Sequence, residues 1–143
     1  MSRTGLSTGI SGIPVTGENS KGQQNALVGN RGEELAASFL ERNGYAIVER
    51  NFRCKGGEVD IVAKDGNTLV FLEVKSRKTL SYGVPQLAVT PFKQRQISKA
   101  ALTWLARNHQ HDKPARFDVI AILLSNDYQH QIEHIKNAFE LAY

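Results

Sequence analysis

The order of hydrophobic and polar positions along the chain predicts two helices and four strands, with a weak fifth strand near the end. Hydrophobic residues recur every three or four positions before Gly44 and again after Pro91, which is the spacing of one buried helix face. Between these helices, short hydrophobic runs bounded by glycine-containing turns are typical of strands. The predicted strands cover residues 45–48, 58–63, 68–75 and 117–124, with the weak one at 131–135.

Capping residues predict where the two helices begin. Asn30 can cap a helix and Glu33 stands three residues later, as in a capping box, so the first helix is predicted to begin near Arg31. Thr90 followed by Pro91 predicts the start of the second helix, because threonine caps well and proline fits the first helical position.

The N-terminal segment differs in composition from the rest. Residues 1–28 are rich in Gly, Ser, Thr and Asn, with too few large hydrophobic side chains to offset the entropy lost on ordering. A chain of 143 residues leaves no room for two cores. We therefore expect a disordered tail at 1–28 and one folded domain at 29–143.

The third predicted strand is hydrophobic at nearly every position from Leu69 to Val74, and Glu73 is the exception. Such a run is typical of a central strand covered on both faces. The turn at 65–67 should join it to the second strand as an antiparallel hairpin. The order of elements is that of an α/β domain.

Composition indicates a cytoplasmic protein with no membrane association. No hydrophobic run approaches the roughly 18 residues that a membrane span needs, and the N-terminus lacks the pattern of a secretory signal. The single cysteine, Cys54, cannot form an internal disulfide, which fits a reducing compartment.

The distribution of charge is more informative than the net charge of +4. From Lys75 to Arg116, nine basic residues stand against one acid, Asp112, a local net charge of +8. A positive region of this kind attracts phosphate-rich ligands. The alternative is a solvated helix face that is merely basic.

Two strands carry residues suited to phosphodiester hydrolysis. Glu58 and Asp60 share one face of the second strand, and Glu73 and Lys75 share one face of the third, because strand residues two apart point the same way. The hairpin brings these faces together. Asp60, Glu73 and the backbone carbonyl of Val74 offer the oxygen ligands that Mg²⁺ prefers. Lys75 would orient the attacking water and stabilise charge on the phosphate.

These residues also have structural interpretations. Glu73 and Lys75 could form an internal ion pair with Asp60 and do no chemistry. Glu33 either supports catalysis or completes the capping box. Glu58 either binds a metal through water or pairs with a base such as Arg53.

Several residues are candidates for contacts with nucleic acid. Lys93 and Gln94 open the second helix, where amides and positive charge favour phosphate. Arg77 comes shortly after the third strand, and Arg53 follows the first; the alternative for Arg53 is an ordinary exposed side chain. Tyr82 either stacks on an unpaired base or anchors its loop.

Other polar residues are assigned structural roles. Arg116 and Asp118, at the start of the fourth strand, are expected to tie its end to the sheet. The four histidines form two pairs that are separated in sequence, and neither pair has the further donors of a zinc site. We therefore expect no zinc.

Several motifs together carry a specific resemblance. They are Gly32-Glu33-x-x-Ala36, Gly44-Tyr45, Asn51-Phe52-Arg53, Gly57-Glu58-Val59-Asp60-Ile61, Phe71-Leu72-Glu73-Val74-Lys75-Ser76-Arg77, Val89-Thr90-x-x-Lys93-Gln94 and Arg116-Phe117-Asp118-Val119. In these motifs the chain resembles the YraN-like family of uncharacterised bacterial proteins, from about residue 30 to the C-terminus. That family resembles archaeal Holliday junction resolvases and the restriction-endonuclease-like fold of the PD-(D/E)xK class.

The resemblance implies a central mixed β-sheet flanked by helices and a metal-dependent cut in DNA. Asp60 would match the first catalytic acid, and Glu73 with Lys75 would match the acid-x-Lys element. Glu33 would match the acid that the resolvases carry on their first helix.

The predicted function is therefore that of an endonuclease dependent on Mg²⁺ or Mn²⁺ that hydrolyses phosphodiester bonds in DNA, with branched or structured DNA as the expected substrate. The alternative is a non-catalytic nucleic-acid-binding or scaffold protein that retains the nuclease fold. A third possibility is a nuclease module that depends on a DNA-processing protein partner. Cutting two symmetric strands would favour a homodimer.

Overall fold

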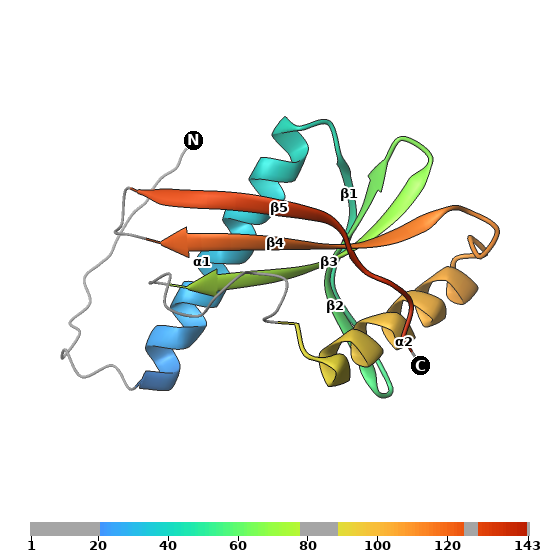
Figure 1. The fold of residues 1–143 in the computed structure, drawn as a ribbon, viewed down its shortest axis with the longest axis horizontal. Helices are drawn as coiled ribbons and strands as arrows, with labels where there is room; N and C mark the ends of the chain where they lie inside the picture. Colours follow the sequence, from blue (N-terminus) through green and yellow to red (C-terminus); the bar gives the residue numbers. More distant parts are fainter. Residues whose placement is uncertain (1–20, 78–88, 125–128, 143) are drawn as a thin grey trace.

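A computed structural model describes residues 21–77, 89–124 and 129–142 of the chain (Figure 1). Within these ranges it contains two helices and five strands. Their bounds are α1 Lys21–Arg42, β1 Ala46–Cys54, β2 Gly57–Asp65, β3 Thr68–Arg77, α2 Pro91–Arg107, β4 Ala115–Leu124 and β5 His130–Phe139.

The five strands form one sheet in chain order, from β1 at one edge to β5 at the other (Figure 1). Neighbouring strands are antiparallel, except for β3 and β4, which are parallel. Helix α2 supplies the connection between β3 and β4 that a parallel pair requires. The predicted α/β class, the hairpin of β2 with β3 and the mixed sheet are confirmed.

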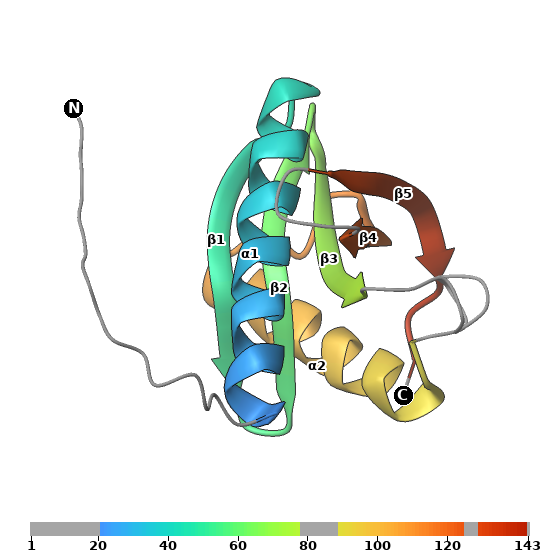
Figure 2. The same cartoon turned by 90° about the vertical axis from the view of Figure 1, so that its left-hand side faces the viewer.

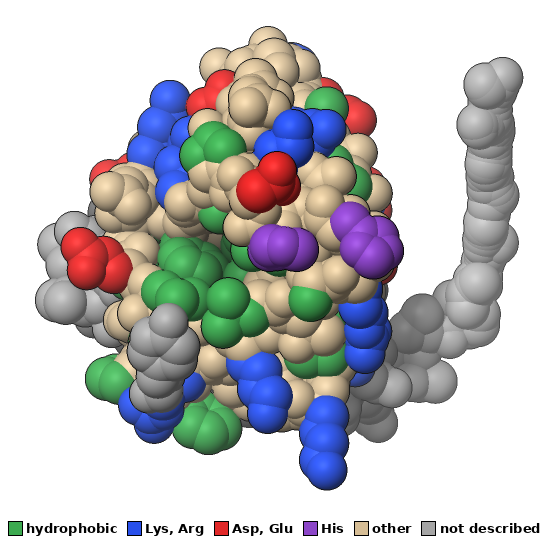
Figure 3. All heavy atoms as spheres, turned by 90° about the vertical axis from the view of Figure 1, so that its right-hand side faces the viewer, with side chains coloured by type: hydrophobic (Ala, Val, Ile, Leu, Met, Phe, Trp, Pro, Cys, Tyr) green, Lys and Arg blue, Asp and Glu red, His purple; other side chains and the backbone are tan. Residues whose placement is uncertain are grey.

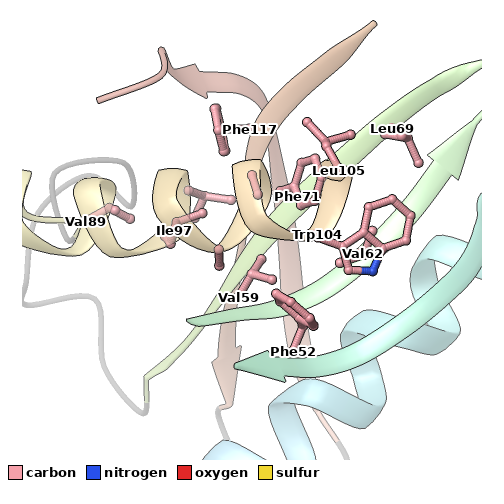
Figure 4. Packing of buried hydrophobic residues seen from close by; sticks show 13 residues of the cluster. Phe52, Val59, Val62, Leu69, Phe71, Val89, Ile97, Trp104, Leu105 and Phe117 are labelled. Carbon is pink, nitrogen blue, oxygen red and sulfur yellow. The ribbon is translucent and has the colours of Figure 1, made fainter. Parts of the chain in front are cut away.

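The two helices cover opposite faces of the sheet (Figures 1 and 2). On one face, α1 contributes Leu40 to a core cluster that includes Leu72. On the other, α2 contributes Ile97 and Trp104 to a cluster that includes Phe71 (Figure 4). Because successive strand residues point to opposite faces, the neighbours Phe71 and Leu72 pack into different cores.

Strand β3 is the centre of the sheet, and its side chains from Leu69 to Leu72 are 0% exposed. This confirms the prediction of a central strand covered on both faces. The next residue is Glu73, so a carboxyl group follows directly on the most deeply buried segment of the fold.

Helix α2 begins as predicted. Its N-cap is Thr90, whose Oγ1 accepts a hydrogen bond of 3.1 Å from the backbone N–H of Lys93, and Pro91 is its first residue. The predicted buried stripe is also confirmed, since Ile97, Ala100, Ala101, Trp104 and Leu105 are all buried.

Helix α1 begins at Lys21, ten residues before the predicted start at Arg31. Asn30 and Glu33 therefore lie inside the helix, and the capping-box interpretation of this pair is wrong. An Asn three residues before a Glu gives the same pattern at a helix start and in a helix interior. Residues 21–28, which we expected in the tail, are helical, and residues 1–20 lie outside the described residues.

All five strands are longer than predicted. Strand β1 extends to Cys54, so Asn51, Phe52 and Arg53 lie within it rather than after it. Strand β4 begins at Ala115, and β5 runs from His130 to Phe139. The hydrophobic runs in the sequence end before the strands do, because polar residues beyond these runs still pair with neighbouring strands through their backbones.

Asn51 has a positive φ of 55°, a conformation that asparagine tolerates better than most residues. Its neighbour Arg50 lies toward α1, where it pairs with Glu34, whereas Phe52 packs in the core cluster beneath α2. Arg50 and Phe52, the residues on either side of this positive φ, thus lie on different faces of the sheet. Asn51 lies opposite the stretch of β2 that carries Asp60.

In the described part of the chain, no helix is long and apolar enough to cross a membrane.

Candidate active site

The predicted acidic residues meet where β2 and β3 separate. The two strands are paired from Asp65 and Thr68 as far as Ile61 and Leu72. Asp60 and Glu73 come next along the two strands. Beyond this last pair, the backbone N–H of Val74 donates a hydrogen bond of 2.8 Å to Asp60 Oδ2. This bond fixes the carboxylate of β2 against the backbone of β3.

A pocket of about 350 Å³ opens at this point. Helix α1, strands β2 and β3 and helix α2 all contribute to it. Its lining residues are Glu33, Glu58, Asp60, Glu73, Val74, Lys75, Ser76, Arg77 and Lys93. The structure therefore brings together Asp60, Glu73 and Lys75, as predicted from strand alternation.

Glu73 is the most unusual group in this pocket. Its side chain is only 5% exposed, and its Oε1 has no hydrogen-bond partner among the described residues. Burial, followed by the negative charge of Asp60 and a hydrogen bond with it, raises the pKa of Glu73 to about 8. The charges of Lys93 and Lys75 oppose this rise without cancelling it. At neutral pH the carboxyl group therefore keeps its proton when nothing else occupies the pocket.

Lys93 occupies the α2 side of the pocket. Its Nζ lies 2.7 Å from Glu58 Oε2. Burial by itself would lower the pKa of Lys93, but the hydrogen bond to Glu58 and the charges of Glu73, Glu58 and Asp60 raise it. The same bond lowers the pKa of Glu58. The cation therefore stays charged beside three acidic groups.

Glu58 and Lys93 differ from the sequence expectations in their surroundings. We expected Lys93 to contact phosphate at the start of a helix, and we considered Arg53 as the partner of Glu58. Arg53 lies opposite Glu58 in the strand register and contributes to lowering its pKa, but less than Lys93 does. Sequence reasoning missed the position of Lys93 in the pocket because its partner is 35 residues away in the chain.

Glu33 reaches the same pocket from the middle of α1. Burial and the negative charge of Asp60 raise its pKa, and a hydrogen bond from Asn51 and the charge of Arg50 counteract them. Its Oε1 lies 3.9 Å from Arg50 Nη2. The environment of Glu33 is therefore that of the acidic pocket rather than that of a helix cap.

The other predicted contact residues are distributed around the pocket. Arg77 lines it, and Arg53 is exposed on β1. The Gln94 side chain donates a hydrogen bond of 3.0 Å to the backbone oxygen of Val89, so it braces the chain just before α2. Tyr82 lies outside the described residues.

A second group of charged residues lies on the α1 face of the sheet. Arg116 Nε is 3.0 Å from Asp118 Oδ1, and Arg116 also binds Asp65 and the hydroxyl group of Tyr45. Asp118, which is 0% exposed, also contacts Nε2 of His134 at 2.7 Å. These contacts confirm that Arg116 and Asp118 tie strand ends together. The contribution of His134 was missed, because it depends on the register of β5 against β4.

No group of three or more His, Cys, Asp or Glu side chains within the described ranges is arranged to hold a metal ion. A metal bound in the pocket would therefore need backbone oxygens, water or substrate in addition to Asp60 and Glu73. Magnesium sites commonly have this composition, with one or two carboxylates and several waters.

A family model described as "Uncharacterised protein family UPF0102" matches residues 32–122, which is more than half of the chain. The chain belongs to this family. The matched stretch of UPF0102 includes every residue that lines the acidic pocket. The predicted YraN-like membership is thereby confirmed at the level of the family.

Relatives of known sequence in UPF0102 extend over most of the chain. A UPF0102 protein of Pelobacter propionicus is 70% identical over 121 residues, which cover 83% of this chain and 86% of that protein. One from Geobacter sulfurreducens is 66% identical over 131 residues, or 92% of this chain and 100% of that protein. A third, from Rhodococcus opacus, is 47% identical over 115 residues, covering 80% and 98%.

Proposed function

We propose that this protein is a metal-dependent endonuclease that hydrolyses phosphodiester bonds in DNA. The observation that carries the proposal is Glu73: a buried carboxyl with an unpaired oxygen, held beside Asp60 in an open pocket that also contains two lysines. Burying a carboxyl group with an unpaired oxygen is costly, so a purely structural site would be expected to replace it. Strongly shifted carboxyl groups in pockets are typical of functional sites.

The donor set fits a hard divalent cation such as Mg²⁺ or Mn²⁺. The unpaired Oε1 of Glu73 and the carboxylate of Asp60 are oxygen donors on adjacent strands, and Val74 adds a backbone carbonyl at the same lining. When bound, the ion would supply a water of lowered pKa and would neutralise charge on the phosphate. Asp60, Glu73 and Val74 are the residues that would hold it.

The lysines have separate tasks in this proposal. Lys75 lies two residues after Glu73 on β3 and lines the same pocket, and its ammonium group would hold a phosphate oxygen and orient water. Lys93 is already bound to Glu58, and its charge acts on Glu73 and Asp60. We infer that Lys93 positions Glu58 and balances the acidic charge while the pocket is filled. Glu33, the fourth carboxyl group of the pocket besides Asp60, Glu73 and Glu58, would receive a proton there.

Basic groups around the pocket supply the proposed contacts with the DNA backbone. Arg77 lines the pocket from the end of β3. Exposed Arg53 lies on β1, opposite the pocket residue Glu58 of β2 in the strand register. Gln94 would act indirectly, by holding the start of α2 in place. The restriction-endonuclease-like fold and the relation to resolvases remain part of this proposal, and so does the preference for branched DNA.

Cleavage of labelled DNA tests the proposal. Four-way junction, flap and linear duplex substrates are incubated with the full chain in Mg²⁺, in Mn²⁺ and in chelator, with gel-shift binding measured in parallel. Asp60→Asn and Lys75→Ala should each lower the cleavage rate about 100-fold or more while binding is retained. Glu34→Gln is the matched control, because Glu34 lies beside Glu33 on α1 but its side chain is 71% exposed.

Two results would contradict the proposal. One is intact DNA with every substrate and both metals. The other is cleavage that survives unchanged in Asp60→Asn, which would indicate a contaminating nuclease. Metal-independent DNA binding without cleavage would favour the non-catalytic scaffold instead.

A further inference from the structure

A second surface feature adjoins the proposed active site along helix α2. It is a groove of about 400 Å³, which we call the α2 groove. The residues that line it include Gly56, Phe92, Arg95, Gln96, Lys99 and Leu102. The five of these residues that belong to α2 have the spacing of one helix face, and this face differs from the buried one that carries Ile97 and Trp104.

The α2 groove exposes hydrophobic surface among positive charges. Phe92 is 62% exposed and Leu102 is 44% exposed. Arg95 and Lys99 lie between them in the sequence, and the lining contains no acidic residue among those described. Lys and Arg side chains also border exposed hydrophobic side chains on the side of the molecule where the chain ends (Figure 3). Hydrophobic patches bordered by polar groups are typical of interaction sites.

The end of the chain forms part of the α2 groove. The backbone N–H of Ala142 donates a hydrogen bond of 2.8 Å to Ser98 Oγ, and Ser98 is fully buried in α2. This bond holds Ala142 against the helix, and Ala142 lines the groove. The groove is therefore built from helix α2, Gly56 and a residue that follows β5.

Chain geometry links this groove to the acidic pocket. Phe92 lines the groove, and the next residue, Lys93, lines the pocket. Successive helix residues are rotated by about 100° around the axis, so the first turn of α2 presents one side chain to each site. A strand whose phosphate lies in the pocket would have its next bases within reach of Phe92.

We propose that the α2 groove binds unpaired bases of a single-stranded DNA segment next to the phosphate in the pocket, with Phe92 as the stacking surface. Arg95 and Lys99 contact the phosphates of the same segment. This inference rests on the proposed function, and it assigns substrates that have unpaired nucleotides beside the scissile bond. Exposed aromatic rings among cations are the usual means of binding single strands, because every base offers a flat face.

Base-paired DNA does not fit this chemistry, since its bases are stacked on one another and are not available to Phe92. A protein partner would use the same hydrophobic surface without requiring a flat ring. Substitutions of Phe92 distinguish these two ligands. Single-stranded DNA requires an aromatic residue at this position, whereas a protein partner would also accept an aliphatic one.

Binding measured in chelator tests the inference separately from cleavage. Fluorescence anisotropy gives the affinity of the full chain for a labelled single strand and for a duplex of the same sequence. Phe92→Ala should weaken single-strand binding about 5- to 100-fold. Duplex affinity should change by less than about twofold, as for an ordinary surface substitution. Phe92→Trp should retain single-strand affinity, whereas Phe92→Leu should lose it.

Val48→Ala is the matched control, because Val48 is also an exposed hydrophobic residue (43%) but does not line the α2 groove. A 2-aminopurine base in the single strand gives a second readout, since its fluorescence should be quenched by the wild type, by Val48→Ala and by Phe92→Trp, but not by Phe92→Ala or Phe92→Leu. Three results would each overturn the inference. They are an equal loss of affinity for single strand and duplex in Phe92→Ala, wild-type single-strand affinity in Phe92→Leu, and no single-strand binding by the wild type. If the protein cleaves DNA but the Phe92 substitutions leave single-strand affinity unchanged, the proposed nuclease function stands and base binding by the α2 groove is refuted. If Phe92 binds single strands selectively but no DNA is cleaved, base binding stands and the nuclease function is refuted.

Discussion

Replacing Glu73 by glutamine removes a proton-binding group while preserving its size. Glu73 is 5% exposed, and burial next to Asp60 raises its pKa from 4.5 to about 8. The amide of Gln has no proton to release in this range. The pH dependence of the difference in stability between wild type and Glu73→Gln therefore reports the cost of ionising this buried carboxyl beside Asp60, with which it shares a hydrogen bond.

The sign and size of the effect follow from proton linkage. An unfolded chain releases the Glu73 proton near pH 4.5, whereas the folded chain keeps it until about pH 8. The folded state thus binds the extra proton between these values, and the free energy of unfolding falls as the pH rises. The stabilisation is fully present below the unfolded pKa and is lost as the pH passes the folded pKa. At about 1.4 kcal/mol per pH unit, roughly 3 kcal/mol is lost between about pH 5.5 and 7.5.

Urea unfolding of both proteins in chelator, at about pH 5.5, 6.5 and 7.5, measures this loss. Relative to wild type, Glu73→Gln should become more stable by up to about 3 kcal/mol across the series, equivalent to a melting-temperature change of roughly 6–12 °C. Any constant cost of the amide cancels in the comparison. A stability difference that stays the same at all three pH values would refute the assignment of a neutral, buried Glu73.

Three other substitutions test the packing that holds the site in place. In Gly57→Ala the added Cβ would lie 2.7 Å from the backbone oxygen of Gln96, so α2 must move off β2; we expect a loss of about 1–3 kcal/mol in urea unfolding, and an unchanged midpoint would refute this close approach. In Gly32→Ala the added Cβ would overlap Ser76 Oγ, so a similar loss is expected, and Ser76→Gly in the same chain should recover part of it. A double variant no more stable than Gly32→Ala would show that Ser76 is not the obstacle. Asp118→Asn breaks a fully buried charge network and should cost about 3–5 kcal/mol by the same assay, whereas a cost below about 1 kcal/mol would mean that the network adds little.

Local patterns were sufficient to predict the centre of the fold. The turn at 65–67 and the run from Leu69 to Val74 lie within a dozen residues, and they specified both the hairpin and the central strand. Because the period of a strand is two, the same stretch also predicted that Glu73 and Lys75 share a face. The pocket lining contains both residues together with Asp60.

The start of α1 could not be predicted from the same kind of pattern. Residues 21–28 offer few hydrophobic side chains, and Asn30 with Glu33 mimics a helix cap. The composition of residues 21–28 indicates only what it would cost to order them in isolation. In the structure they extend a helix whose later turns pack on the sheet, so they do not bear the cost of starting a new helix. In the structure, Glu33 lies in the acidic pocket and not at the helix start.

Contacts between distant elements account for the remaining differences. The pair of Lys93 with Glu58 joins α2 to β2 and depends on how the helix crosses the sheet. The contact of His134 with Asp118 depends on the register of β5, which contains an irregularity between Phe117 and Val119 on its partner strand. Neither arrangement has a local sequence signal, so an isolated lysine and an isolated histidine gave no indication of their partners.

The central claim is that the pocket around Asp60 and Glu73 cuts DNA with the help of a metal. The most direct test is the single-turnover cleavage rate of a labelled flap substrate at saturating protein, measured against Mg²⁺ concentration for wild type and Glu73→Gln. The wild-type rate should rise with Mg²⁺ and vanish in chelator, and the rate of the variant should be about 100-fold or more lower. A substrate left intact by the wild type at every Mg²⁺ concentration, or cut equally fast by Glu73→Gln, would contradict the central claim.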